Sequence, residues 1–265
     1  MPFIEVNKVV HYYTIEGAES APTLVFSNSL GSDHRIWDSA LPYLRDKFQI
    51  IRYDQRGHGL SDATPAPYAI RDLVDDFAGL LDRLNIDNAY VCGLSVGGMI
   101  AQGFAASFPQ RAHALVLCDT AMQIGPASIW NERIAVIQKD GISALTDAIM
   151  ERWFTQAFRE SRVTEFSGYI NMLERTPVEG YIGTCCAIRD ADLREAAAAI
   201  RRPTLVLCGD QDLATPPDLA RRLAEAVAGA KFSLIEGAAH ISCVEQPELF
   251  SRLLIDFWEE IKNDR

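Results

Sequence analysis

The sequence predicts an α/β fold: a mostly parallel, eight-stranded sheet with helices on both faces and a helical cap inserted into it. Short apolar, β-branched runs alternate with amphipathic helical stretches, as in parallel strands joined by crossover helices. Most of these runs are continuously apolar, which is expected of strands that are buried on both faces. The alternation stops after Asp119 and resumes at Pro203, so the residues between them are predicted to form a helical unit.

Strands are expected at residues 23–27, 48–53, 89–92, 114–118, 204–208 and 231–235. Residues 2–14 are expected to add an antiparallel hairpin at the sheet edge, which completes the set of strands. Helices are expected at residues 69–84, 99–107, 217–228 and 247–262, where apolar residues recur with a helical period.

The interval between the two halves of the sheet has helical patterning and no convincing strand, at residues 126–138, 141–158, 161–175 and 178–187. An insertion of about 75 residues is long for a plain connection. The predicted organisation is therefore a core in two parts, residues 1–121 and 198–265, with a cap or lid formed by residues 122–197. The alternative is a structural excursion without a role in function.

Acidic residues outnumber basic residues, 36 to 25, and give a formal net charge of −11. This balance argues against binding to nucleic acid or to an anionic membrane surface, although one arginine in a pocket can still hold a small anion. The N-terminal residues lack the features of a secretory signal, and no segment approaches the roughly 20 apolar residues of a membrane helix. Six cysteines without a C-x-x-C pattern are expected to be reduced, and Cys92, Cys118 and Cys208, near the ends of apolar runs, are expected to be buried. We therefore expect a soluble, cytoplasmic protein, and the sequence predicts no oligomeric state.

The strongest chemical signal is the G-x-S-x-G motif at residues 93–97. It follows a predicted strand and precedes a predicted helix, which is the context of a nucleophile elbow. Such a turn strains the backbone and lifts the serine hydroxyl clear of the sheet, while the two glycines leave room for the neighbouring strand and helix. Ser95 is therefore the predicted nucleophile.

A serine nucleophile needs a base and an acid that orients the base, and in this motif the acid and then the histidine follow the serine along the chain. His240 follows the last predicted strand and is the candidate base, because the other histidines precede the candidate acids or lie in other elements: His11, His34, His58 and His113. Asp212, just past the predicted strand at 204–208, is the candidate acid. Asp119 and Asp210 are rivals at comparable strand ends.

The oxyanion formed in acyl transfer needs two backbone N–H donors. One is expected from Val96, directly after the nucleophile, and the other from the loop after the predicted strand at 23–27. Leu30 is the candidate in that loop, with Ser29 as the alternative.

The turn at residues 52–61 is rich in charge and glycine. It lacks the G-x-x-x-x-G-K-[ST] pattern of a phosphate loop. We interpret it as a salt-bridged structural loop.

Taken together, these motifs resemble the α/β-hydrolase superfamily over nearly the whole chain: residues 28–31, the D-x-R-G-H-G-x-S turn at 54–61, residues 93–98, G-x-x-D at 209–212, and His240. More narrowly, the chain resembles the 3-oxoadipate enol-lactonases of the β-ketoadipate pathway of aromatic-compound degradation. This narrower resemblance rests on Trp130 and Arg133 and on the strings SNSLGSD, RYDQRGHG, CGLSVGG, ERWFT, GDQDLATPP and AAHIS. The family comparison favours Asp212 as the acid.

The resemblance implies that Ser95 attacks the carbonyl of an enol-lactone, the ring opens to an acyl-enzyme, and water activated by His240 releases 3-oxoadipate. It implies no metal and no organic cofactor. The small anionic lactone carries a carboxylate, for which Arg133 is the candidate partner, since a guanidinium binds a carboxylate in a bidentate manner. Trp130 and Trp153 are candidate walls of the pocket. Packing is the alternative role for both tryptophans, and a solvated surface charge is the alternative for Arg133.

The same triad serves other reactions, so the motifs alone leave several functions open. The nearest alternatives are a carboxylesterase, another lactonase, a cofactor-free perhydrolase or a hydrolase of carbon–carbon bonds. Epoxide hydrolases and dehalogenases are disfavoured because they resemble the motif with aspartate in place of Ser95. A ligand receptor without turnover is the most distant alternative.

Overall fold

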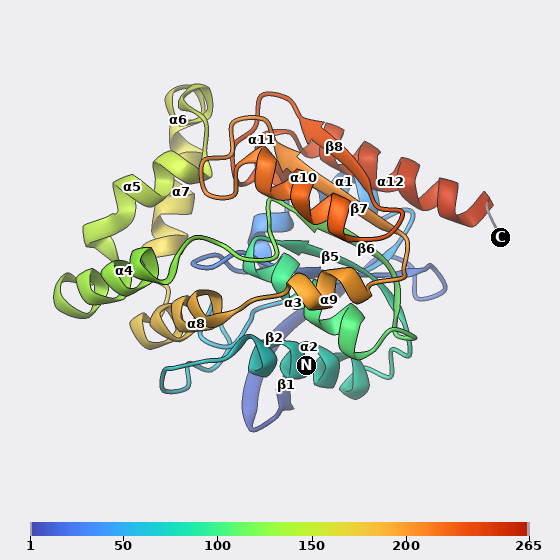
Figure 1. The fold of residues 1–265 in the computed structure, drawn as a ribbon, viewed down its shortest axis with the longest axis horizontal. Helices are drawn as coiled ribbons and strands as arrows, with labels where there is room; N and C mark the ends of the chain where they lie inside the picture. Colours follow the sequence, from blue (N-terminus) through green and yellow to red (C-terminus); the bar gives the residue numbers. More distant parts are fainter. Residues whose placement is uncertain (1, 264–265) are drawn as a thin grey trace.

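The computed structural model describes residues 2–263, which contain one eight-stranded sheet (Figure 1). The strand order is β1-β2-β4-β3-β5-β6-β7-β8. The hairpin of β1 (Phe3–Val6) and β2 (Val9–Glu16) is antiparallel, and β2 pairs antiparallel with β4 (Gln49–Tyr53). All other neighbours are parallel, and the remaining strands are β3 (Thr23–Ser27), β5 (Ala89–Leu94), β6 (Ala112–Cys118), β7 (Thr204–Gly209) and β8 (Lys231–Ile235). The predicted fold class is confirmed.

Helices cover both faces of this sheet. On one face α2 (Ile70–Arg83) contacts α3 (Val96–Ser107), α3 contacts α9 (Arg194–Ala199), and α9 contacts α10 (Pro217–Ala226). On the other face α1 (Leu41–Leu44) contacts α12 (Pro247–Asn263) (Figure 1). Helices α2, α10 and α12 each have one apolar stripe that favours this packing, whereas α3 is apolar on nearly all sides and is buried among its neighbours.

Helix α2 illustrates how the sequence produces these layers. Leu73, Phe77 and Leu81 recur every fourth residue and are buried, whereas the ion pair between Arg71 and Asp75 lies on the exposed side. Residues spaced by four lie on the same side of a helix, so the spacing turns one face towards the sheet.

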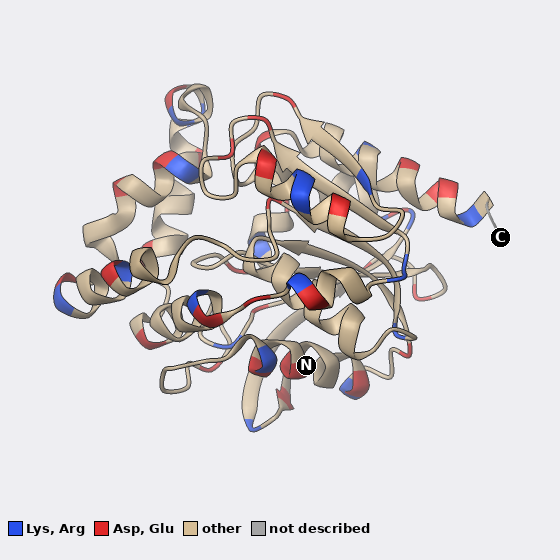
Figure 2. Cartoon of the chain, viewed as in Figure 1, with Lys and Arg blue, Asp and Glu red and all other residues tan. Residues whose placement is uncertain are grey.

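The central strands are buried along their length, as their continuously apolar sequences predict. Each residue of β7 is buried, and so are the six cysteines, all of which are free. The predicted burial of Cys92, Cys118 and Cys208 is therefore confirmed. Among the described residues, no helix has the length and apolarity needed to cross a membrane. Basic and acidic residues are interleaved along the outer helices (Figure 2).

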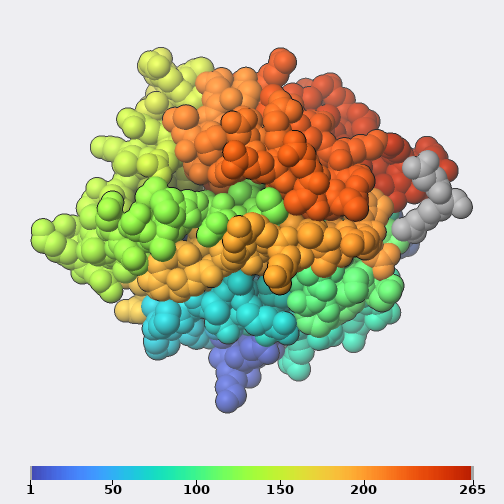
Figure 3. Space-filling view, viewed as in Figure 1, coloured from blue at the N-terminus to red at the C-terminus, as the bar shows by residue number. Residues whose placement is uncertain are grey.

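The chain between β6 and β7 is helical: α4 (Ala127–Asp140), the 3₁₀ helix η2 (Ile142–Leu145), α5 (Thr146–Trp153), α6 (Gln156–Ser161), α7 (Val163–Glu174), α8 (Val178–Asp190) and α9. The helices from α4 to α8 gather at one end of the molecule and form a continuous surface with the core (Figure 3). Helix α9 instead packs against the core helices α3 and α10. The division into core and cap stays a proposal, and this packing favours ending the cap after α8.

The helical stretch expected at 141–158 is divided into three elements. Phe154 is extended, with φ −131° and ψ 142°, and ends α5. Thr155 then caps α6, because its hydroxyl accepts a hydrogen bond from the N–H of Phe158 at 3.2 Å. This break lies beside the loop that carries His240.

Two short helices complete the fold. The 3₁₀ helix η1 (His34–Trp37) follows β3, and α11 (Ser242–Glu245) follows the loop after β8. Both lie near the carboxyl ends of the parallel strands, where active sites of open α/β sheets form.

Candidate active site

Ser95 stands in the sharp turn between β5 and α3. Its φ of 58° and ψ of −118° are rare for a residue with a side chain, and the N–H of Ser95 donates to the carbonyl of Cys118 at 3.0 Å. A Cβ atom on Gly93 would lie 2.2 Å from the carbonyl oxygen of Gly97, and one on Gly97 would lie 2.0 Å from that of Ser27. The close packing around the turn therefore requires both glycines of the motif.

The side chains of His240 and Asp212 meet behind the turn. Nδ1 of His240 lies 2.9 Å from Oδ2 of Asp212, and both side chains are buried. The carboxylate also accepts hydrogen bonds from the N–H of Ala214 and from the N–H and hydroxyl of Thr215, at 2.7, 2.9 and 2.7 Å. This bonding places the hydrogen of a neutral imidazole on Nδ1 and leaves Nε2 as its basic nitrogen.

The electrostatics of this pair suit a base and its orienting acid. Burial lowers the pKa of His240, but the Asp212 carboxylate and, to a smaller extent, Asp119 more than offset burial, so the pKa lies above the ordinary value of 6.5. Burial raises the pKa of Asp212, but His240 and the hydrogen bonds from Thr215 hold it below its ordinary range. Asp212 is therefore ionised at neutral pH, ready to stabilise a protonated His240.

Neither rival carboxylate has a hydrogen bond to His240 in the described part of the chain. Asp119 accepts from the N–H of Gly209 at 2.7 Å and from the hydroxyl of Ser242 at 2.5 Å. Asp210 accepts hydrogen bonds from the backbone N–H groups of Gly237 and Ala238. The geometry thus favours Asp212 over both.

Asp119 nevertheless lies close to the pair, since one ligand-type atom each of Asp119, Cys208 and Asp212 lie within 4.8 Å of one another. Burial, and after it the charge of Asp212, raises the pKa of Asp119 to about 8. The carboxyl group of Asp119 is therefore mostly protonated at pH 7. It forms hydrogen bonds to β7 and α11 without adding a second full negative charge beside Asp212.

The turn at 52–61 supports the loop in which the oxyanion donor is expected. The side-chain amide of Gln55 donates to the carbonyl of Asn28 at 2.7 Å, and Nε2 of His58 accepts from the N–H of Gly31 at 3.0 Å. Burial lowers the pKa of His58, so its ring is neutral and can accept this hydrogen bond. The N–H of Gly31 is thereby engaged, and Leu30 and Ser29 stay the candidate donors.

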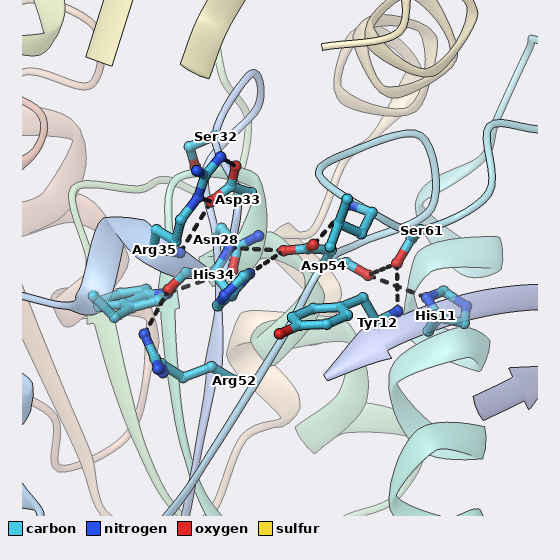
Figure 4. Close-up of polar contacts among 12 residues, drawn as sticks. His11, Tyr12, Asn28, Ser32, Asp33, His34, Arg35, Arg52, Asp54 and Ser61 are labelled. Carbon is cyan, nitrogen blue, oxygen red and sulfur yellow. Dashed lines mark hydrogen bonds and ion pairs between the residues drawn. The ribbon is translucent and has the colours of Figure 1, made fainter. Parts of the chain in front are cut away.

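Asp54 ties the same turn together from within (Figure 4). Oδ1 accepts from the N–H and the ring Nδ1 of His34, each at 2.8 Å, and Oδ2 accepts from the N–H of Leu60 at 2.8 Å. Arg56 pairs with Asp76 on α2, at 2.7 Å for one of their hydrogen bonds. This bonding agrees with our interpretation of the segment as a salt-bridged structural loop.

A cavity of about 240 Å³ opens above Ser95. His240, Leu30 and Ser29 line it beside the serine, and so do the three cap residues expected at the substrate: Arg133, Trp130 and Trp153. The structure therefore brings these predicted residues to one site. Val96 follows Ser95 at the start of α3, and Asp212 lies behind His240.

Other residues that line the cavity were not predicted from the sequence, among them Arg152 and Tyr181. Arg133 lies 4.8 Å from the ring centre of Trp130, and both arginines act on the Tyr181 hydroxyl: burial raises its pKa, and the two positive charges oppose that rise. No ion pair to Arg133 or Arg152 is found among residues 2–263. The cavity thus holds two guanidinium groups available to an anion. Arg152 could have been predicted from the sequence, because it directly precedes Trp153, a predicted wall residue, in the string ERWFT.

Within residues 2–263, two groups of side chains have the composition of metal ligands: Asp33, His34 and Asp54, and the group of Asp119, Cys208 and Asp212. In the first group Asp33 accepts from Arg35 at 2.6 Å, and Asp54 accepts from His34. In the second, burial raises the pKa of the Cys208 thiol, which disfavours the thiolate that binds metals. Hydrogen bonds within the protein account for both arrangements.

A family model described as the alpha/beta hydrolase fold matches residues 22–247. With the fold and the nucleophile turn already described, this match shows that the chain belongs to the α/β-hydrolase family.

Within that family the chain is similar to enol-lactonases. It is 36% identical to 3-oxoadipate enol-lactonase 2 of Acinetobacter baylyi, over 90% of this chain and 89% of the relative. It is 33% identical to 3-oxoadipate enol-lactonase 1 of the same organism, over 94% and 92%. The crystal structure of the enol-lactonase from Burkholderia xenovorans LB400 matches with a TM-score of 0.95 and 39% identity, over 97% of this chain and 100% of that one. The predicted resemblance and the predicted class of enzyme, a hydrolase of ester bonds, are confirmed.

Proposed function

We propose that this hydrolase opens 3-oxoadipate enol-lactone to 3-oxoadipate through an acyl-enzyme on Ser95, within the β-ketoadipate pathway of aromatic-compound degradation. One observation carries the proposal: Ser95 and His240 share a small cavity with two arginines that have no carboxylate partner in the described chain. An ester carbonyl and a carboxylate on one small molecule match these two features. The enol-lactonase relatives support the same substrate.

In the first half of the reaction, Oγ of Ser95 forms a bond to the lactone carbonyl carbon while Nε2 of His240 takes the hydroxyl proton. Asp212 stabilises the imidazolium that forms, and the N–H groups of Val96 and Leu30 are the proposed oxyanion donors. The ring C–O bond then breaks, the enol oxygen leaves with the proton from His240, and the enol becomes a ketone.

In the second half, water attacks the acyl carbon while His240 takes one of its protons. The bond to Ser95 breaks, and the serine oxygen regains its proton from His240. The product is a keto acid with two carboxylates, one of them newly formed from the lactone carbonyl. The same base therefore serves both halves.

The two arginines have distinct places in this proposal. Arg133 is half-buried and stacked on Trp130, which fixes its guanidinium in the cavity. Arg152 is more exposed and also lines the cavity. We assign the substrate carboxylate to Arg133, and to Arg152 a supporting positive charge that counteracts the net negative charge of the protein.

The test is to generate the enol-lactone enzymatically and follow its disappearance by ultraviolet absorbance. We expect rapid loss with the wild type and only the uncatalysed rate with Ser95→Ala. Circular dichroism of both proteins serves as the control for folding. Equal rates with the two folded proteins would contradict the proposal.

A further inference from the structure

The loop that carries His240 is bonded to one short segment of the cap. This segment, residues 153–155, is the break between α5 and α6. The N–H of Ile241 donates to the carbonyl of Trp153 at 3.0 Å. Because Trp153 also lines the cavity, the loop of the proposed base is joined directly to one wall of the site.

Glu245 makes a second connection on the other side of the histidine. Its Oε2 accepts from the N–H of Ala239 at 2.6 Å. Its Oε1 accepts from the N–H and the hydroxyl of Thr155, at 3.0 and 2.7 Å. The residues directly before and after His240 are thus both held to the same cap segment.

The chemistry of this connection calls for a carboxylate. Glu245 is buried, with 9% of its surface exposed, and three donors point at its two oxygens. Burial raises its pKa, while Thr155, the N–H of Ala239 and the charge of Arg162 oppose that rise. An amide in place of the carboxylate would turn an NH₂ group towards an N–H donor, and two donors cannot satisfy each other.

We propose that Glu245 is a positioning residue that fixes His240 relative to residues 152–155, so that the base and the cavity wall formed by Arg152 and Trp153 move as one unit. The proposal rests on the role of His240 as the base in the proposed function. In this proposal residues 152–155 keep a fixed position relative to His240 and belong to the catalytic site at all times. Any opening of the cap must then occur at its other helices.

The test compares Glu245→Gln with Glu248→Gln, which removes the same charge from an exposed position three residues away. The probe is p-nitrophenyl acetate, a neutral ester that reports on Ser95 and His240 without requiring the enol-lactone. We expect kcat to fall about 10- to 100-fold in Glu245→Gln, since small displacements of a catalytic group have effects of that order. We expect Glu248→Gln to match the wild type.

Three results separate positioning from general destabilisation. The acid limb of the kcat/KM profile should move to lower pH in Glu245→Gln, because a displaced His240 loses part of its contact with Asp212. Thr155→Val should lower kcat about fivefold by removing one donor, and Thr155→Ser, which keeps the hydroxyl, should restore it. In the double variant Glu245→Gln/Thr155→Val, the effect of the valine should be smaller than in the wild-type background, because the amide can no longer accept from both Thr155 and Ala239.

These experiments distinguish failure of the Glu245 proposal from failure of the proposed function. If the wild type hydrolyses p-nitrophenyl acetate through Ser95 but not the enol-lactone, the substrate is wrong and the Glu245 proposal stands on its own variants. Wild-type kcat and an unchanged acid limb in folded Glu245→Gln would overturn it. Should that variant not fold, equal kcat in Thr155→Val and Thr155→Ser would overturn it instead.

Discussion

Nε2 of His58 accepts a hydrogen bond from the backbone N–H of Gly31 at 3.0 Å. The other ring nitrogen of His58 lies 3.2 Å from the carbonyl of Arg56, to which it donates. The ring therefore joins the turn at 52–61 to the loop that holds the candidate oxyanion donors Leu30 and Ser29. A histidine excluded as the base thus acts on the site through the backbone.

The first prediction concerns this link. His58→Ala removes the acceptor for Gly31, so the oxyanion loop loses its alignment, and we expect kcat to fall about tenfold or more with little change in KM. Steady-state kinetics on a neutral ester measure the effect. His113→Ala, at the start of β6 and away from the serine turn, is the control. Equal losses in both variants would refute a specific role for His58.

The second prediction separates the two buried carboxylates. Asp212→Asn removes the charge that orients His240 and stabilises its protonated form, so kcat should fall about 10³- to 10⁴-fold. Asp119→Asn keeps an acceptor for Gly209, and Asp119 carries little charge at pH 7, so kcat should stay within about fivefold of the wild type. Steady-state kinetics at pH 7 compare them. The reverse order would make Asp119 the acid.

The third prediction is a pH profile. The base form of His240 is the neutral imidazole, so kcat/KM rises as pH increases through the pKa of His240. Because Asp212 raises that pKa above 6.5, the midpoint of the acid limb should lie above 6.5. In Asp212→Asn burial remains and the carboxylate is gone, so the midpoint should move to lower pH. An unchanged midpoint in this variant would exclude His240 as the group that titrates.

The fourth prediction concerns the arginines. Arg133→Ala should raise KM for the carboxylated lactone by about tenfold or more, because it removes a charge-assisted contact. Arg152→Ala should raise it less, because it removes only a supporting positive charge. KM for a neutral ester should hardly change. Arg194→Ala, which removes an equal charge from the exposed pair with Asp192, controls for net charge. Parallel increases for both substrates would indicate a packing role.

The sequence predicts those parts of this molecule that local patterns determine. Most of the parallel strands are continuous apolar runs. Ser95 could be predicted as the nucleophile because its turn needs glycines at fixed positions. The order of serine, acid and histidine along the chain predicted His240 as the base, and the structure shows its contact with Asp212. These features depend on residues close together in the chain or on a general rule of the fold.

Contacts between segments that are far apart in the sequence could not be predicted from such local patterns. Arg152 looks like any exposed helix charge until the cavity is assembled, and Thr155 gains its role only where the chain leaves α5 beside α11. The pairing of His58 with Gly31 likewise depends on two loops that meet at the ends of adjacent strands. Tertiary packing, rather than residue type, decides each of these roles.

The central claim, that Ser95 opens a carboxylated enol-lactone, is tested most directly by rapid-quench mass spectrometry of the enzyme mixed with 3-oxoadipate enol-lactone. Ring opening expels no fragment, so the acyl-enzyme should carry the mass of one whole lactone, on the peptide that contains Ser95. The adduct should be missing from Ser95→Ala, which should also show no turnover above background. Turnover of the lactone by Ser95→Ala at the wild-type rate, or an adduct on another residue, would contradict the account.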